Sequence, residues 1–193
     1  MATTVGVLAL QGAYQKHVES LARLGVESVL VRKSAELDGC DGLIIPGGES
    51  TTMSLLINES GMYDPLRDFA QRKPVMGVCA GMIMMADSVD DDRVTPLKIL
   101  PFRALRNHYG RQVHSFTAEI ELEIPSDDGP FQAHFIRAPG VTDPGEGVDV
   151  LARFDDEIIM IGWNGHLALS FHPELTHDDR IHRYWLSRYA RSR

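Results

Sequence analysis

The sequence of 193 residues predicts an α/β protein with a mixed, mainly parallel central sheet, helices packed on that sheet, and additional antiparallel strands in the C-terminal half. Two observations lead to this prediction. In the first half, short apolar runs alternate with amphipathic helical stretches, which is the pattern of strands joined by crossover helices. In the second half, short β-like runs follow one another between Gly, Pro and Asp turns, which favours antiparallel pairing. Because no repeat or long linker divides the chain, we expect one domain over residues 1–193.

The first half begins with an apolar strand and then repeats a cycle of helix and strand. The first strand is expected at residues 4–10, and residues 14–24 have helical spacing. Gly25 punctuates the end of this helix. Further strands are expected at 27–31, 42–45 and 74–78, and further helices at 50–59, 63–72 and 82–87. Apolar strands of this kind are usually buried on both faces.

The second half is expected to be mostly β-structure. Strands are predicted at residues 118–124, 131–136, 148–154, 158–163 and 167–171, followed by a final helix over about residues 179–190. Residues 87–101, which include three consecutive aspartates at 90–92, have no clear period. We therefore predict a surface loop there.

The composition excludes several classes of function. A net charge of −8 and an isoelectric point near 5.4 argue against a general nucleic-acid binder, because phosphate contacts require clustered Lys and Arg. No apolar run approaches the ~20 residues that span a bilayer, so no membrane insertion is expected. The chain has two cysteines, and its first residues lack the pattern of a signal peptide. We therefore expect a reducing, cytoplasmic setting.

The motif Gly-Val-Cys-Ala-Gly at residues 77–81 follows an expected strand and precedes an expected helix, as a nucleophile elbow does. Its sharp turn needs small residues two positions either side of the nucleophile, and Gly77 and Gly81 supply them. A helix N-terminus favours the thiolate and so lowers the pKa of Cys79. The Ala80 N–H is expected to point toward a developing oxyanion. This context indicates that Cys79 is a nucleophile.

A cysteine nucleophile also needs a base, and that base is most often a histidine. His172 lies directly after an expected strand, at the sheet edge where Cys79 is also expected. Glu174 can orient one imidazole nitrogen, and Pro173 fixes the backbone between them. Cys40 has no comparable context and is expected in the core. Because no metal-binding motif is present, other histidines are expected to be structural or surface groups, including His108, His114 and His134.

Further motifs resemble those of a known family. They are Gly-Val-Leu-Ala-Leu-Gln-Gly at 6–12, Pro-Gly-Gly-Glu-Ser-Thr at 46–51, Arg-Asn at 106–107, Gly-Arg-Gln at 110–112, Phe-Ile-Arg-Ala-Pro at 135–139 and His-Pro-Glu-Leu-Thr at 172–176. With the elbow, they make nearly the whole chain similar to class I, triad-type glutamine amidotransferases. More narrowly, the chain resembles the glutaminase subunit of pyridoxal 5′-phosphate synthase.

This resemblance implies a flavodoxin-like, three-layer α/β fold and a catalytic triad of Cys79, His172 and Glu174. It also implies that L-glutamine contacts Gly47, Gly48, Glu49, Arg106, Ile136 and Arg137. The Gly48 N–H is expected to join the Ala80 N–H as the second donor of an oxyanion hole. No cofactor and no metal are expected. The implied partner is a (β/α)8 synthase subunit that receives the ammonia in a large hetero-oligomer.

The sequence departs from the family pattern at Val78 and at His108-Tyr109, and residues 87–101 resemble the family less. Three alternatives remain open. The chain could be a class I glutaminase that serves another synthase, a cysteine-dependent hydrolase or stress protein with the same elbow, or a binding module without activity. Glutamate release from glutamine, measured with and without the synthase subunit, separates these alternatives.

Overall fold

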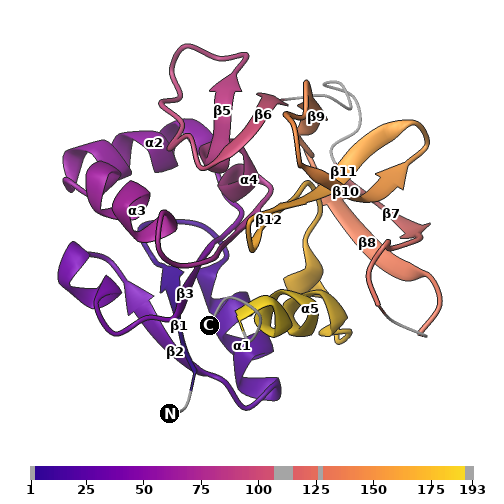
Figure 1. Cartoon of the computed structure of the whole chain (residues 1–193), viewed down its shortest axis with the longest axis horizontal. Coiled ribbons are helices and arrows are strands. Elements are labelled where there is room, and N and C mark those ends of the chain that lie inside the picture. Colours follow the sequence, from indigo (N-terminus) through magenta and orange to yellow (C-terminus); the bar gives the residue numbers. More distant parts are fainter. Residues whose placement is uncertain (1–2, 107–114, 126–127, 190–193) are drawn as a thin grey trace.

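A seven-stranded sheet forms the centre of the computed structural model, which describes residues 3–106, 115–125 and 128–189 (Figure 1). The strands follow the order β10-β11-β12-β4-β3-β1-β2. The parallel strands are β1 (Thr4–Leu8), β2 (Glu27–Val31), β3 (Gly42–Ile45), β4 (Val75–Val78) and β12 (His166–Leu169). The antiparallel strands at one edge are β11 (Glu157–Trp163) and β10 (Asp149–Phe154). The predicted mixed, mainly parallel sheet is confirmed.

Helices cover both faces of this sheet, as Figure 1 shows. One face carries α2 (Ser50–Glu59), α3 (Tyr63–Ala70) and α4 (Ala80–Met85), and the other carries α1 (Tyr14–Arg23) and α5 (Arg180–Tyr189). Successive side chains of a strand point to opposite faces, so β3 sends Leu43 and Ile45 into one apolar core and Ile44 into the other. Burial of apolar surface on both faces of the sheet therefore stabilises the predicted three layers.

Two smaller sheets extend the three-layer unit. A three-stranded sheet contains β5 (Ala86–Val89), β6 (Leu100–Leu105) and β9 (Gly140–Thr142). An antiparallel pair contains β7 (Ser115–Ile120) and β8 (Phe131–Ile136). Two short 3₁₀ helices also occur, η1 (Ser34–Leu37) and η2 (Pro173–Leu175). The antiparallel pairing predicted for the second half is confirmed.

The prediction of a surface loop over residues 87–101 was right only in part. Residues 90–99 form no helix or strand and are mostly exposed or half-buried, but the ends of the range belong to β5 and β6, and some apolar residues are buried. The helix after the elbow ends at Met85, two residues earlier than predicted, and β5 follows it directly. Leu97 and Ile99 are buried because their N–H groups donate to Met84 and Met85 at 2.7 and 2.9 Å, which holds the segment against the end of α4. Apolar residues in such an irregular segment have no regular spacing, so a periodicity argument misses their burial.

Most remaining differences concern the ends of elements. The first strand ends at Leu8 instead of residue 10, and β7 covers Ser115–Ile120 instead of residues 118–124. Beyond β7, Leu122 forms only an isolated bridge with Ala152. The strand Gly140–Thr142 was not predicted, because three residues are too few to show an alternating pattern.

The sheet order brings three strand ends to one place. Strands β12, β4 and β3 are parallel neighbours, so their carboxyl ends lie side by side at one edge of the sheet. The segments that follow them contain His172, Cys79 and Gly47. In open α/β sheets, this edge is where ligands bind.

Candidate active site

A cavity of about 250 Å³ lies at the carboxyl ends of these strands and includes almost every residue predicted for the site. Its lining contains Gly47, Gly48, Glu49, Cys79, Ala80, Arg106, Ile136, Arg137 and His172. Glu174 lies behind His172 and does not line the cavity. Ala13, Ser50 and Ile83 line the cavity without having been predicted. The Gly-Arg-Gln motif and the two histidines at 108 and 114 lie outside the described residues.

Cys79 occupies a strained turn between β4 and α4, which confirms the predicted elbow geometry. Its φ of 52° and ψ of −105° are unfavourable for a residue with a side chain. A Cβ on Gly81 would collide with the Ile45 carbonyl oxygen, and a Cβ on Gly77 would collide with the Met85 sulfur. Only glycine fits at these two positions. Since Ala80 is the first residue of α4, its N–H has no acceptor within the helix and is available at the cavity.

His172 and Glu174 form a buried pair beside Cys79. His172 Nδ1 lies 2.7 Å from Glu174 Oε1, and the two residues are 6% and 3% exposed. The backbone N–H of His172 donates to His134 O at 2.8 Å, which ties this segment to β8. A Cβ on Gly47 would collide with the imidazole Cε1 of His172, so the loop after β3 approaches the ring as closely as glycine allows. The histidine is therefore held from several sides.

The electrostatics of the pair favour a protonated histidine. Burial by itself lowers the pKa of His172, but hydrogen bonding and charge from Cys79 and Glu174 more than offset this effect and raise the pKa to about 10. The Nε2 atom has no acceptor within strict hydrogen-bond geometry among the described residues, and Cys79 is the group close enough to act on it. The Cys79 Sγ also lies 3.8 Å from Ile136 O. This arrangement places a protonated imidazole next to the Cys79 side chain.

Glu49 and Arg106 form an ion pair on one wall of the cavity. Arg106 Nη2 lies 2.5 Å from Glu49 Oε1, and Arg106 also pairs with Asp91. Glu49 caps α2 as well, since its carboxylate accepts from Thr51 N at 3.2 Å and Thr52 N at 2.7 Å. Burial raises the pKa of Glu49, but hydrogen bonds from the two threonines outweigh it and lower the pKa to about 2. These contacts hold the Glu49 carboxylate and the Arg106 guanidinium in place without a ligand.

Arg137, unlike Arg106, has no ion-pair partner among the described residues that would compete with a ligand. It follows β8 with a φ of 45°, is exposed, and forms no ion pair with another described residue. Its place in the lining of the cavity makes its guanidinium available to a carboxylate.

Several supporting residues were missed by the sequence argument. The Gln11 side chain brackets the loop after β3, with its Oε1 accepting from Glu49 N at 3.3 Å and its Nε2 donating to Glu49 O at 3.4 Å. His17 and His182 are fully buried behind Glu174. A lone histidine on a helix carries little information in a single sequence, so no pattern pointed to them. Gln11 does lie in a segment that resembles the family.

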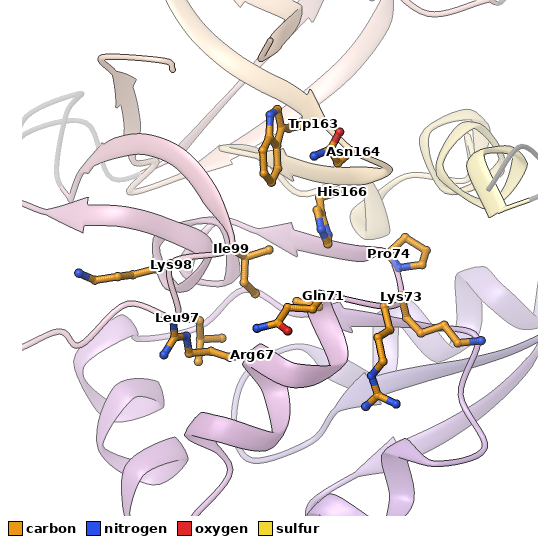
Figure 2. Close-up of a pocket in the computed structure, with 12 residues that line it drawn as sticks. Arg67, Gln71, Lys73, Pro74, Leu97, Lys98, Ile99, Trp163, Asn164 and His166 are labelled. Carbon is orange, nitrogen blue, oxygen red and sulfur yellow. The ribbon is translucent and has the colours of Figure 1, made fainter. Parts of the chain in front are cut away.

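A second cavity, of about 400 Å³, lies at the other end of the parallel strands, where β4 and β12 begin (Figure 2). It is bounded by the start of β4 and the turn before β12. The ammonium groups of Lys73 and Lys98 point away from each other in Figure 2, so they do not converge on one ligand. Burial lowers the pKa of His166 to about 4, and its Nδ1 accepts from Val75 N at 3.1 Å. Among the described residues, the lining of this second cavity contains no nucleophile with a base. The smaller cavity, which contains Cys79 and His172, is therefore the candidate active site.

Metal-binding clusters and membrane-spanning helices are both absent from the described ranges 3–106, 115–125 and 128–189. No group of three or more His, Cys, Asp or Glu side chains there could hold a metal ion. In the same ranges, no helix is long and apolar enough to cross a membrane.

Comparison with known proteins places this site in context. The SNO glutamine amidotransferase family matches residues 7–191. The pyridoxal 5′-phosphate synthase subunit PdxT of Pelotomaculum thermopropionicum is 46% identical over 189 residues, which are 97% of this chain and 96% of that protein. The PdxT subunit of Halalkalibacterium halodurans is 46% identical over 183 residues, which are 94% of this chain and 92% of that protein.

Solved structures give the same result. A crystal structure of a glutamine amidotransferase aligns with a TM-score of 0.89 at 44% identity, covering 96% of this chain and 98% of that chain. The PurLQS structure from Thermotoga maritima aligns with a TM-score of 0.69 at 16% identity, covering 100% and 97%, and at that identity shows the fold alone. The match of residues 7–191 and the high identities over nearly the whole length decide the family. This chain belongs to the SNO glutamine amidotransferase family.

Proposed function

We propose that the chain hydrolyses L-glutamine to glutamate and ammonia and supplies the ammonia to a pyridoxal 5′-phosphate synthase subunit, in vitamin B6 biosynthesis. Membership of the glutamine amidotransferase family and the names of the relatives support this function. The observation that carries it is one cavity in which Cys79, on a strained elbow, lies beside the His172–Glu174 pair. The relatives also favour a glutaminase over a stress protein or a binding module.

In the proposed mechanism, the Cys79 thiolate attacks the carboxamide carbon of glutamine. The N–H groups of Gly48 and Ala80 stabilise the oxyanion, and protonated His172 gives its proton to the departing ammonia. A thioester on Cys79 remains. Neutral His172 then removes a proton from water, which attacks the thioester and releases glutamate. Glu174 orients the imidazole throughout. The raised pKa of His172 supports this cycle, because a protonated imidazole is available to give its proton to the departing ammonia.

We propose that glutamine contacts Gly47, Gly48, Glu49, Arg106, Ile136 and Arg137. Arg137 is suited to the α-carboxylate, because it is the exposed cation in the lining and has no ion-pair partner among the described residues. The Glu49 carboxylate is suited to the α-ammonium group, because its low pKa keeps it ionised. Its bonds to Arg106 and to the start of α2 fix where that charge lies. The reaction as proposed needs no cofactor and no metal.

We further propose that the partner is a (β/α)8 synthase subunit in a large hetero-oligomer, and that the setting is cytoplasmic. Both cysteines are free and buried, which is consistent with a reducing compartment. A second candidate function is not favoured by any feature of the cavity.

The test uses the chain together with a pyridoxal 5′-phosphate synthase subunit and its sugar phosphates. With glutamine as nitrogen source, Cys79→Ala should abolish formation of pyridoxal 5′-phosphate, whereas an ammonium salt should restore it, because only ammonia release is lost. Cys40→Ala is the matched control, since Cys40 is equally buried but lies away from the cavity. Glutamine-fed synthesis by Cys79→Ala at the level of Cys40→Ala would refute the assignment.

A further inference from the structure

The carboxylate of Glu174 has a second oxygen that the triad does not use. Oε1 faces His172, while Oε2 is buried and has no hydrogen-bond partner among the residues that the structure describes. An ionised carboxylate oxygen left in this state would be strongly destabilising. The group that faces Oε2 is the imidazole of His17, whose Nε2 lies 3.7 Å away. His17 is 0% exposed and belongs to α1, a different element from the Glu174 segment.

A second buried imidazole, that of His182, lies next to His17 on the side away from Glu174. His17 Nδ1 lies 3.2 Å from Nε2 of His182, which belongs to α5 and is also 0% exposed. Figure 1 shows α1 and α5 next to each other on the same face of the sheet. Burial lowers the pKa of both imidazoles, so both are neutral. A neutral imidazole has one donor and one acceptor nitrogen. The nitrogen that carries the proton in one ring therefore decides which nitrogen carries it in the other.

Only one arrangement of protons gives Glu174 a donor. His17 must carry its proton on Nε2, directed at Glu174 Oε2, and its Nδ1 must then accept from Nε2–H of His182. The charged groups near this line are His172 beyond Glu174, and the Arg23–Asp179 pair close to His182. That pair is bidentate, with distances of 2.8 and 2.6 Å, so its charges are largely satisfied by each other.

We propose that His17 is a positioning residue that holds Glu174 through its second carboxylate oxygen, and that His182 fixes the tautomer of His17. The line of interacting groups then runs from Cys79 through His172 and Glu174 to two histidines on α1 and α5. The proposal rests on the triad assigned above. Its chemical role is to keep Glu174 ionised and correctly directed at His172, while His17 itself never touches the substrate.

The position of α1 gives this role a structural basis. The residue just before the helix, Ala13, donates from its N–H to Gly47 O at 3.2 Å, so the start of α1 supports the loop that approaches His172. At its other end, Arg23 binds Asp179 and the Thr176 carbonyl, which follow Glu174 in the chain. The helix is therefore anchored on both sides of His17, which fixes the backbone position from which the imidazole faces Glu174.

The test compares three variants of α1. His17→Leu removes the donor and keeps an apolar side chain, and it should lower kcat for glutamine hydrolysis about tenfold with little change in KM, as expected for one hydrogen bond to a charged group. The acid limb of the kcat profile should move to higher pH, because Glu174 loses the N–H donor that stabilises its ionised form and so keeps its pKa low. His17→Gln places an amide N–H near the former Nε2 and should restore most of the rate and the profile.

Leu21→Ala is the matched control for stability. Leu21 is fully buried on the same helix, but its substitution should reduce the melting temperature while leaving kcat and the pH profile unchanged. If Leu21→Ala changes the pH profile as His17→Leu does, or if His17→Leu keeps the wild-type kcat and profile, the positioning role is refuted. An inactive Cys79→Ala together with a normal His17→Leu would refute this inference alone and leave the proposed function standing.

A spectroscopic measurement tests the proposal even if the His17 and Leu21 variants do not fold. Nitrogen-15 NMR of imidazole-labelled wild-type protein should show His17 and His182 neutral at pH 7, each with its proton on Nε2. The His17 Nε2 shift should change in Glu174→Gln more than the His182 shift does. A proton on Nδ1 of His17 would overturn the proposed line.

Discussion

Cys79 combines a strained backbone with the side chain that we propose as the nucleophile. The turn brings Cys79 into the lining of the cavity, and the raised pKa of the neighbouring imidazole suits it to the proposed protonation of the leaving group. Behind it, Glu174 is buried and its pKa is lowered by His17 and His172 despite the opposing effect of burial. The charge states of His172 and Glu174 therefore depend on each other.

This dependence predicts unequal and non-additive effects of substitution. His172→Asn should reduce glutamine hydrolysis almost as much as Cys79→Ala, whereas the loss in Glu174→Gln should be roughly 10- to 100-fold smaller, because an orienting group matters less than the base. Steady-state kinetics with purified variants measures these losses. A double variant of Cys79 and His172 should be no slower than the worse single variant, and a further large loss would show that the two residues act independently.

At the scale of elements, the turn between β4 and α4 is the feature on which the site depends. Gly77 and Gly81 touch across this turn, and Gly81 also meets the Ile45 carbonyl of the neighbouring strand. The sequence motif alone predicted this turn, because glycines two residues either side of a cysteine are typical of a sharp strand-to-helix turn. It could not predict the burial of Leu97 and Ile99, whose segment is held by hydrogen bonds to the end of α4.

Gly81→Ala tests the importance of this contact. The new Cβ would collide with backbone of β3, which cannot move as a side chain does, so we expect a loss of about 1–3 kcal/mol in the free energy of unfolding, together with reduced activity. Gly39→Ala is the matched control, because a Cβ there has no neighbour within 4 Å. Urea denaturation measures both variants. Equal stability and activity of the two would show that the elbow tolerates a larger residue.

At the scale of the whole molecule, the order of strands decides which residues meet. The site joins segments after β3, β4, β8 and β12, and these come from all parts of the chain. Local patterns predicted most of the strands and the parallel block, but they contain no information on which strands are neighbours. The resemblance to a family supplied that information for the triad and the glutamine contacts. It did not extend to the histidines on α1 and α5, whose proximity to Glu174 arises only from packing.

The whole-molecule arrangement also predicts dependence on a partner. The chain has a cavity suited to the proposed release of ammonia, and hydrolysis without a partner to use that ammonia would consume glutamine to no purpose. We therefore expect slow hydrolysis by the isolated chain and faster hydrolysis with the synthase subunit. Correct placement of one oxyanion donor in the loop at 47–49 is worth on the order of 10²–10³ in rate, so docking needs to move only one backbone group. Glutamate release at saturating glutamine, measured while the synthase subunit is titrated, should rise and reach a plateau. If another ammonia-using synthase accelerates the chain and this subunit neither binds nor accelerates it, the proposed partner is wrong and the glutaminase activity alone remains.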